Sequence, residues 1–306
     1  MSSKSIILTE HHNIQTPCKL FVVGEPQVLL IQPSARHEEK NDGVQREVEL
    51  IAQASGNGFA IVFFDCVEWA RALMPWADDA VSRDAEVGSH APDTLRFIEH
   101  TLLPWLRERF GALPCIIGGY SLGGLFALWA ARNTDAFAAV AAASPSLWIK
   151  GWGEYAAAHP ILSPQATIQH STLYTQHSSS PQATIQHSTL NTQHSELRYS
   201  AIHLSLGDRE EHCRNQRMKR IGDCVRAEYD LLCKQLSPPP SLCVGTKADT
   251  SAPKPSAQRK PSHGVWSTYK RKNIFISSSI FDKNTAILSS IFDKISIFAH
   301  NSTNLF

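Results

Sequence analysis

Residues 118–124 read Gly-Gly-Tyr-Ser-Leu-Gly-Gly, and this stretch constrains the fold of the chain more than any other. It contains the pattern G-x-S-x-G around Ser121, with an apolar run at 114–117 before it and a helix-forming run at 125–132 after it. A strand, a sharp turn and a helix in this order are the context of a nucleophile elbow, in which the serine is held in a strained conformation. We therefore interpret Ser121 as a nucleophile, with the backbone N–H of Leu122 directed at the developing oxyanion. The alternative is a tight turn without a catalytic role.

Apolar runs and helical periodicities alternate along the chain. Strands are expected at 6–8, 19–23, 28–32, 59–64, 114–117, 137–143 and 201–207, and helices at 42–55, 93–110, 125–132 and 215–236. Buried strands that alternate with helices predict an α/β fold with a doubly wound, mostly parallel sheet.

Two segments depart from this alternation. Residues 163–179 and 180–196 are near copies of each other, rich in Gln, Ser, Thr and His, and without an apolar face. We interpret 163–196 as a low-complexity insertion, although its regularly spaced histidines invite a metal-binding reading. Residues 237–306 contain a proline run and a duplicated S-S-I-F-D-K without periodicity. We predict one domain over 1–236, interrupted by the insertion, and a non-globular, disordered tail.

Charge and cysteine usage bear on partners and compartment. The net charge is +1 and no block of like charge occurs, which argues against nucleic acid or an anionic membrane as a partner. The first residues lack a long apolar run, and no stretch approaches membrane-spanning length. The seven cysteines are an odd number without a C-x-x-C pair, which favours reduced thiols over a zinc site. We expect a cytoplasmic protein with no metal and no cofactor, and the sequence leaves its oligomeric state open.

Three longer motifs occur in order: G-G-Y-S-L-G-G-L-F-A-L-W-A at 118–130, A-A-A-S-P-S-L-W at 141–148 and L-S-L-G-D-R-E-E at 204–211. Together they resemble the putative-esterase family of α/β hydrolases, which includes enterochelin-esterase-like and esterase-D-like enzymes. The resemblance covers roughly residues 20–236 apart from the insertion. It implies the α/β-hydrolase fold and hydrolysis of a small-molecule carboxylic ester through an acyl-enzyme on Ser121.

The resemblance also implies the other site residues. The catalytic acid should follow the strand that ends at Gly207, where the family's G-x-x-E pattern favours Glu210 and leaves Asp208 second. A solvated acidic turn is the alternative for both residues. The second oxyanion amide should follow the strand at 59–64, near Val67 or Glu68. His203 lies within an expected strand, and we interpret it as a packed core residue.

The catalytic histidine is missing from its expected place. By the resemblance it should lie beyond the last core strand, in something like W-N-x-G-x-H-F, and no such motif occurs. His212 comes too early, His263 lies in Pro- and Lys-rich sequence, and His300 lies in the duplicated tail. Without a base, a serine hydroxyl at neutral pH is a poor nucleophile.

The genetic code permits a frameshift as the explanation. Val244–Ser251 can be encoded by a set of codons that has a second reading. When these codons are read from the third base of the Val244 codon, they give W-N-Q-G-G-H-F. The same frame over Ala257–Val265 permits T-K-K-A-F-A-W-G-L, which is similar to the family's closing helix. Our hypothesis is that the frame is lost between about Leu236 and Val244, which would remove the histidine, the final strand and the final helix. An impaired esterase, a non-catalytic binding protein and a non-functional product are the three resulting readings.

Overall fold

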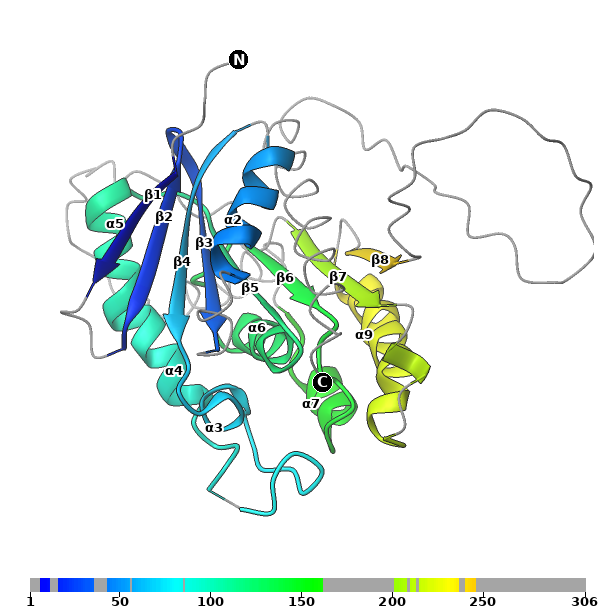
Figure 1. The fold of residues 1–306 in the computed structure, drawn as a ribbon. Helices are drawn as coiled ribbons and strands as arrows, with labels where there is room; N and C mark the ends of the chain where they lie inside the picture. Colours follow the sequence, from blue (N-terminus) through cyan, green and yellow to red (C-terminus); the bar gives the residue numbers. More distant parts are fainter. Residues whose placement is uncertain are drawn as a thin grey trace, which may run out of the picture.

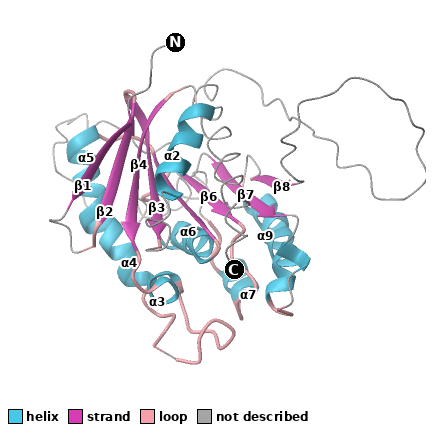
Figure 2. Cartoon of the chain, in the orientation of Figure 1, coloured by secondary structure: helices cyan, strands magenta, loops and turns pink. Residues whose placement is uncertain are grey.

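The computed structural model describes residues 6–11, 16–35, 43–55, 57–84, 86–161, 201–207, 210–212, 215–236 and 240–245. Figures 1 and 2 show how these residues are arranged. The predicted insertion at 163–196 and most of the predicted tail lie outside the described residues.

One eight-stranded sheet forms the centre of the described residues, in the order β1-β2-β4-β3-β5-β6-β7-β8. Its strands are β1 Ile6–His11, β2 Cys18–Val23, β3 Pro26–Ser34, β4 Gly58–Asp65, β5 Cys115–Tyr120, β6 Ala139–Ala143, β7 Ala201–Gly207 and β8 Ser241–Gly245. Strands β1 and β2 are antiparallel to their neighbours, and the pairs from β4 to β8 are parallel. The prediction of a mostly parallel, doubly wound α/β sheet is therefore confirmed.

Helices lie on both faces of the sheet. They are α2 Gly43–Ala54, α3 Trp69–Leu73, α4 Ala91–Phe97, α5 Leu103–Phe110, α6 Leu122–Asn133, α7 Trp152–Ala158 and α9 Ile221–Gln235. A π-helical segment, Ile98–Leu102, joins α4 to α5 just before Pro104, which has no N–H to donate into a helix. Helices α3 and α7 were not predicted from the sequence, because helices of five and seven residues are too short to show a helical period.

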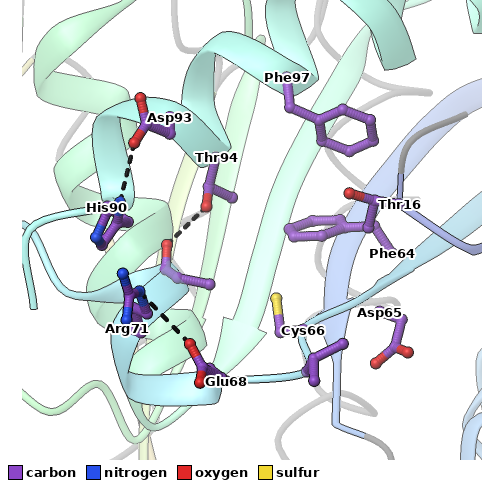
Figure 3. A pocket seen from close by; sticks show the side chains of 12 residues that line it. Thr16, Phe64, Asp65, Cys66, Glu68, Arg71, His90, Asp93, Thr94 and Phe97 are labelled. Carbon is purple, nitrogen blue, oxygen red and sulfur yellow. Dashed lines mark hydrogen bonds and ion pairs between the residues drawn. The ribbon is translucent and has the colours of Figure 1, made fainter. Parts of the chain in front are cut away.

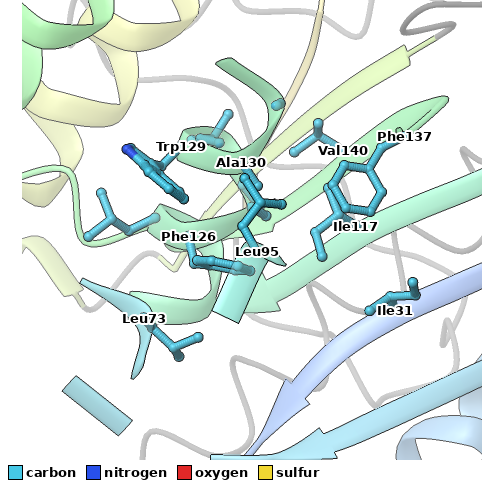
Figure 4. Packing of buried hydrophobic residues seen from close by; sticks show 14 of the residues in the cluster. Ile31, Leu73, Leu95, Ile117, Phe126, Trp129, Ala130, Phe137 and Val140 are labelled. Atoms are coloured by element: carbon cyan, nitrogen blue, oxygen red, sulfur yellow. The ribbon is translucent and has the colours of Figure 1, made fainter. Parts of the chain in front are cut away.

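The two faces of the sheet carry separate apolar cores. Among the described helices only α2 covers one face, where Val44, Val48 and Ile51 pack against the strands (Figure 1). The other helices cover the opposite face, where the larger core lies; Figure 4 shows part of it around α6. Nearly every residue of α6 is buried, as expected of a helix enclosed by the sheet and by neighbouring helices.

The sheet continues past the predicted domain end at residue 236. β8 pairs in parallel with β7, from His203 opposite Ser241 to Gly207 opposite Gly245, and Leu242 packs against the larger core. The predicted boundary is therefore too early, and the expected loss of the last strand is wrong for residues 241–245. β8 was not predicted because five residues directly after a proline run are too few to show the alternation of apolar and polar side chains that marks a strand.

A buried ion pair fastens the helices on the larger core. Arg132 of α6 and Glu228 of α9 bind each other with almost no exposed side-chain surface. Trp152 of α7 donates its indole N–H to the same carboxylate over 3.0 Å. Three helices are thus tied together through Glu228, on the face of the sheet that also carries the start of α6.

Candidate active site

The carboxyl ends of the parallel strands meet at one edge of the sheet, and the predicted site residues follow them. Ser121 comes directly after β5, Val67 shortly after β4 and Glu210 shortly after β7. Strand β3 is flanked by β4 on one side and β5 on the other, so the direction of winding reverses beside Ser121. Ligands of open α/β sheets bind in the crevice at such a point.

The backbone of Ser121 has the strained conformation expected of a nucleophile elbow. Its φ is 57° and its ψ is −116°, and Leu122 is the first residue of α6. A Cβ atom on Gly119 would lie 2.6 Å from the carbonyl carbon of Gly123, closer than real Cβ contacts allow. The close approach of β5 and α6 therefore requires a glycine at 119, as the spacing of the motif predicts.

A second serine lies against Ser121. The Oγ atoms of Ser121 and Ser146 are 3.0 Å apart, and Ser146 is buried while Ser121 is half-buried. The Ser121 backbone N–H donates to the Ala143 carbonyl over 3.0 Å, and the Ser146 backbone N–H donates to the Ser121 carbonyl over 3.0 Å. The turn after β6 is thereby attached to the turn after β5. Ser146 belongs to the motif A-A-A-S-P-S-L-W, and no role for it was predicted from the sequence.

Glu210 lies in the turn after β7, as expected of the catalytic acid. The Tyr120 hydroxyl donates to one of its carboxylate oxygens over 3.2 Å, and the Gly207 backbone N–H donates to the other over 3.4 Å. Burial, together with the negative charge of Glu210 and this hydrogen bond, raises the pKa of Tyr120 above its usual range. The side chain before the nucleophile thus contacts Glu210. Asp208, the second candidate, lies outside the described residues.

A surface pocket of about 480 Å³ adjoins the segment predicted to carry the second oxyanion amide. Figure 3 shows its lining residues: Thr16, Phe64, Asp65, Cys66, Val67, Glu68, Arg71, Ala72, His90, Asp93, Thr94 and Phe97. Val67 and Glu68 belong to this set and Ser121 does not. Trp69, the next residue, reaches toward the elbow, since a Cβ on Gly123 would lie 3.6 Å from its ring.

Three histidines of the described residues lie in different environments. His203 is buried in β7, as expected of a core residue, and burial lowers its pKa to about 4. His212 is exposed in the 3₁₀ turn Glu210–His212. His90, which the sequence analysis did not weigh, lines the pocket with Nδ1 3.0 Å from Asp93 Oδ2. His263 and His300 lie outside the described residues.

Ser121 Oγ has one side-chain partner within the described residues, and this partner is Ser146. No histidine of the described residues forms a hydrogen bond with Ser121 Oγ.

Asp78 ties together the loops around this edge, and the sequence analysis did not single it out. Its carboxylate accepts from the backbone N–H groups of Lys150 and Ala80 over 2.6 and 2.7 Å and from the Arg217 guanidinium over 2.7 Å. Burial raises the pKa of Asp78, but these three donors outweigh it and hold the pKa below its usual range. The loop after α3 is thus fixed to the loops that follow β6 and β7.

No group of three or more His, Cys, Asp or Glu side chains within the described ranges is placed to hold a metal ion. The helices in the same ranges are all too short or too polar to cross a lipid bilayer.

The strained serine between a parallel strand and a buried helix, at the winding reversal of the sheet, defines an α/β-hydrolase-type protein. The model of the putative esterase family matches residues 37–226, which is more than half of the 306 residues. The chain therefore belongs to the putative esterase family, a family of ester hydrolases that act on small-molecule esters. The family resemblance seen in the three sequence motifs is confirmed.

Several solved structures match the chain with low sequence identity. Siderophore hydrolase EstA from Aspergillus nidulans is 15% identical, with a TM-score of 0.47 and coverage of 80% of this chain and 87% of that chain. An IroE-like serine hydrolase from Shewanella oneidensis is 14% identical, with a TM-score of 0.47 and coverage of 81% and 74%. The enterobactin esterase FES from Shigella flexneri is 14% identical, with a TM-score of 0.41 and coverage of 79% and 53%. No curated protein matches the chain. Similarities of this size carry no argument about the substrate.

Proposed function

We propose that this chain is a serine-dependent carboxylic ester hydrolase that forms an acyl-enzyme on Ser121. The observation that carries the proposal is the backbone of Ser121, a non-glycine residue with a φ of 57° at the start of a buried helix. Such conformations persist only where the surrounding structure enforces them, and they gather at active sites. Membership of the putative esterase family supports the same reaction.

The reaction begins when Ser121 Oγ attacks the ester carbonyl carbon and its proton passes to a base. The carbonyl oxygen then becomes negatively charged and accepts a hydrogen bond from the Leu122 backbone N–H at the start of α6. In the proposal the second donor is a backbone N–H near Val67 or Glu68. The alcohol leaves with a proton, and water then hydrolyses the acyl-enzyme.

Glu210 is our proposed acid, and its role is to orient a histidine and stabilise it in the charged form. Each of its oxygens already accepts one hydrogen bond, from Tyr120 or from Gly207, and each can accept another. Asp208 remains the second candidate.

The base is proposed to come from the chain beyond β8, where a frame change would have altered it. β8 pairs with β7 through Gly245 in the recorded frame, and the permitted W-N-Q-G-G-H-F begins at the Val244 codon. The proposed loss of frame lies between about Leu236 and Val244. The polypeptide as recorded would then be an impaired esterase. Sequencing the gene and its transcript across the codons for Leu236–Val265 tests this: an unchanged frame contradicts a recording error.

Pre-steady-state hydrolysis of p-nitrophenyl acetate tests the proposed activity. An acyl-enzyme on Ser121 predicts a burst of p-nitrophenol that Ser121→Ala abolishes. In a chain whose restored frame encodes W-N-Q-G-G-H-F, Glu210→Gln should slow the reaction about a hundredfold or more if Glu210 is the acid. Glu211→Gln is the matched control, because the neighbouring Glu211 binds Arg226 instead.

One alternative function follows from the single hydroxyl partner of Ser121 within the described residues. An esterase-like protein without a base would bind an ester and show no burst, and this outcome would favour a binding protein. Insoluble protein would favour a non-functional product. A cytoplasmic location is part of the proposal and stays to be tested by fractionation.

A further inference from the structure

Ser146 is a buried polar side chain that the reaction described above does not use. Only 2% of its surface is exposed, and its Oγ lies 3.0 Å from Ser121 Oγ. Buried hydroxyl groups are normally hydrogen-bonded. Among the residues that the structure describes, Ser121 is the one that provides Ser146 with a side-chain partner.

The loop that carries Ser146 is fixed on several sides. Ser144 turns the chain after β6 with a φ of 41°, which is unusual for a residue with a Cβ. Pro145 packs on the first turn of α6, since a Cβ on Gly124 would lie 3.1 Å from its Cβ. The Ser146 backbone N–H donates to the Ser121 carbonyl. The Ser146 hydroxyl is therefore held in place before any substrate arrives, which is the arrangement that favours electrostatic stabilisation.

The direction of the hydrogen bond between the two hydroxyl groups follows from the chemistry. A serine hydroxyl has one proton to donate. When Ser121 gives this proton to a base, its Oγ can only accept hydrogen bonds. Ser146 must then be the donor, and it keeps its own proton while no bond to its oxygen forms or breaks.

We propose that Ser146 is a further catalytic residue, whose hydroxyl donates to Ser121 Oγ and stabilises the negative charge that develops there as the proton leaves. The inference rests on the proposed function, because it requires Ser121 to be the attacking group. Hydrogen bonds to charged oxygens are stronger than those to neutral ones. The donor therefore acts most strongly during attack and less once Ser121 Oγ is part of an ester, which lowers the barrier to acylation.

The test is the rate at which a fluorophosphonate labels Ser121 in the full chain, measured from pH 6 to 10. We expect Ser146→Ala to slow labelling about tenfold or more and to shift the rate-pH profile to higher pH. Ser146→Thr keeps the hydroxyl and should retain most of the rate. Cysteine is similar in size to serine and its thiol is only a weak hydrogen-bond donor, so Ser146→Cys should label as slowly as Ser146→Ala. If Ser146→Ala does not fold, Ser146→Cys replaces it in the test.

Ser144→Ala is the matched control. It removes a buried hydroxyl from the same loop, one that has no hydrogen-bond partner within the described residues, and it should leave the rate unchanged. The proposal is overturned if Ser146→Ala labels within twofold of the unaltered chain and with the same pH profile.

The same labelling data distinguish a failure of the proposed function from a failure of the proposed role of Ser146. Labelling of Ser121 only at alkaline pH, where hydroxide removes its proton, would refute base-assisted attack in this chain, as expected of an esterase impaired by the loss of its histidine, and the Ser146 comparison would still be decided there. A chain that labels no faster than Ser121→Ala at every pH refutes both proposals.

Discussion

The Tyr120 hydroxyl donates to a Glu210 carboxylate oxygen over 3.2 Å, so the residue before the nucleophile is bonded to the proposed acid. This contact joins the end of β5 to the turn after β7, across the end of β6. It places Glu210 beside the elbow without any contribution from the chain beyond β8.

The Tyr120–Glu210 contact predicts a change in tyrosine titration. Burial and the negative charge of Glu210 both raise the pKa of Tyr120, and burial remains when Glu210 is replaced. Glu210→Gln should therefore lower the pKa of Tyr120 and leave it above its usual value. Ultraviolet difference titration at alkaline pH, with Tyr120→Phe to assign the signal, measures it. Glu211→Gln should not move the titration, and an equal shift in both variants would contradict the contact.

The strain at Ser121 predicts that the site costs stability. Glycine adopts a positive φ freely, whereas alanine keeps the Cβ that makes the conformation unfavourable. Ser121→Gly should be more stable than Ser121→Ala by about 1 kcal/mol, after the greater flexibility of glycine in the unfolded chain is allowed for. Urea denaturation gives both free energies of unfolding. If the alanine variant proves the more stable, Ser121 is not strained.

The close approach at Gly119 predicts a large effect of one methyl group. Gly119→Ala would place a Cβ 2.6 Å from the Gly123 carbonyl carbon. We expect a loss of about 2 to 3 kcal/mol in the free energy of unfolding. Labelling of Ser121 should be lost as well.

Gly153→Ala is the control for this variant. Gly153 lies in α7 with open space where a Cβ would be, so alanine should stabilise the helix by about 1 kcal/mol. Similar effects of the two substitutions on stability would argue against a tight elbow.

The buried histidine of β7 predicts a pH dependence of stability. Burial lowers the pKa of His203 to about 4 in the folded chain, while the unfolded chain has a value near 6.5. Below about pH 6.5 the unfolded state binds a proton that the folded state does not. The contribution of His203 to the free energy of unfolding is therefore fully present above about pH 6.5. It falls by up to about 3 kcal/mol as the pH decreases to about 4.

Urea titrations between pH 4 and 7.5 check this dependence. His203→Gln should flatten the fall in stability, and His212→Gln, at an exposed histidine, should leave it as in the unaltered chain. A curve for His203→Gln with the original slope would show that other groups are responsible.

Much of the fold could be predicted because its signals are local. The unbroken apolar run of β4, the G-x-S-x-G motif and the helical spacing of apolar residues over 93–110 each indicate one element from a few neighbouring residues. β8 and α7 were missed because their short segments form through contacts with distant chain, such as the pairing of β8 with β7. The secondary-structure propensity of a short segment does not indicate with which distant strand it will pair.

The candidate site divides in the same way. Ser121 and Leu122 follow from a motif, and Glu210 follows from its place after a strand. The contact between Ser146 and Ser121 could not be predicted, because it depends on how two turns 25 residues apart meet at the sheet edge. The contact of Tyr120 with Glu210 could not be predicted either, because the two residues are 90 positions apart in the sequence.

The most direct test of the central claim is intact-mass and peptide-mass analysis of the chain after reaction with diisopropyl fluorophosphate. We predict a single phosphoryl adduct on the peptide that contains Ser121, absent from Ser121→Ala. An adduct on a different residue, or equal labelling of Ser121→Ala, would contradict the assignment of Ser121 as the nucleophile.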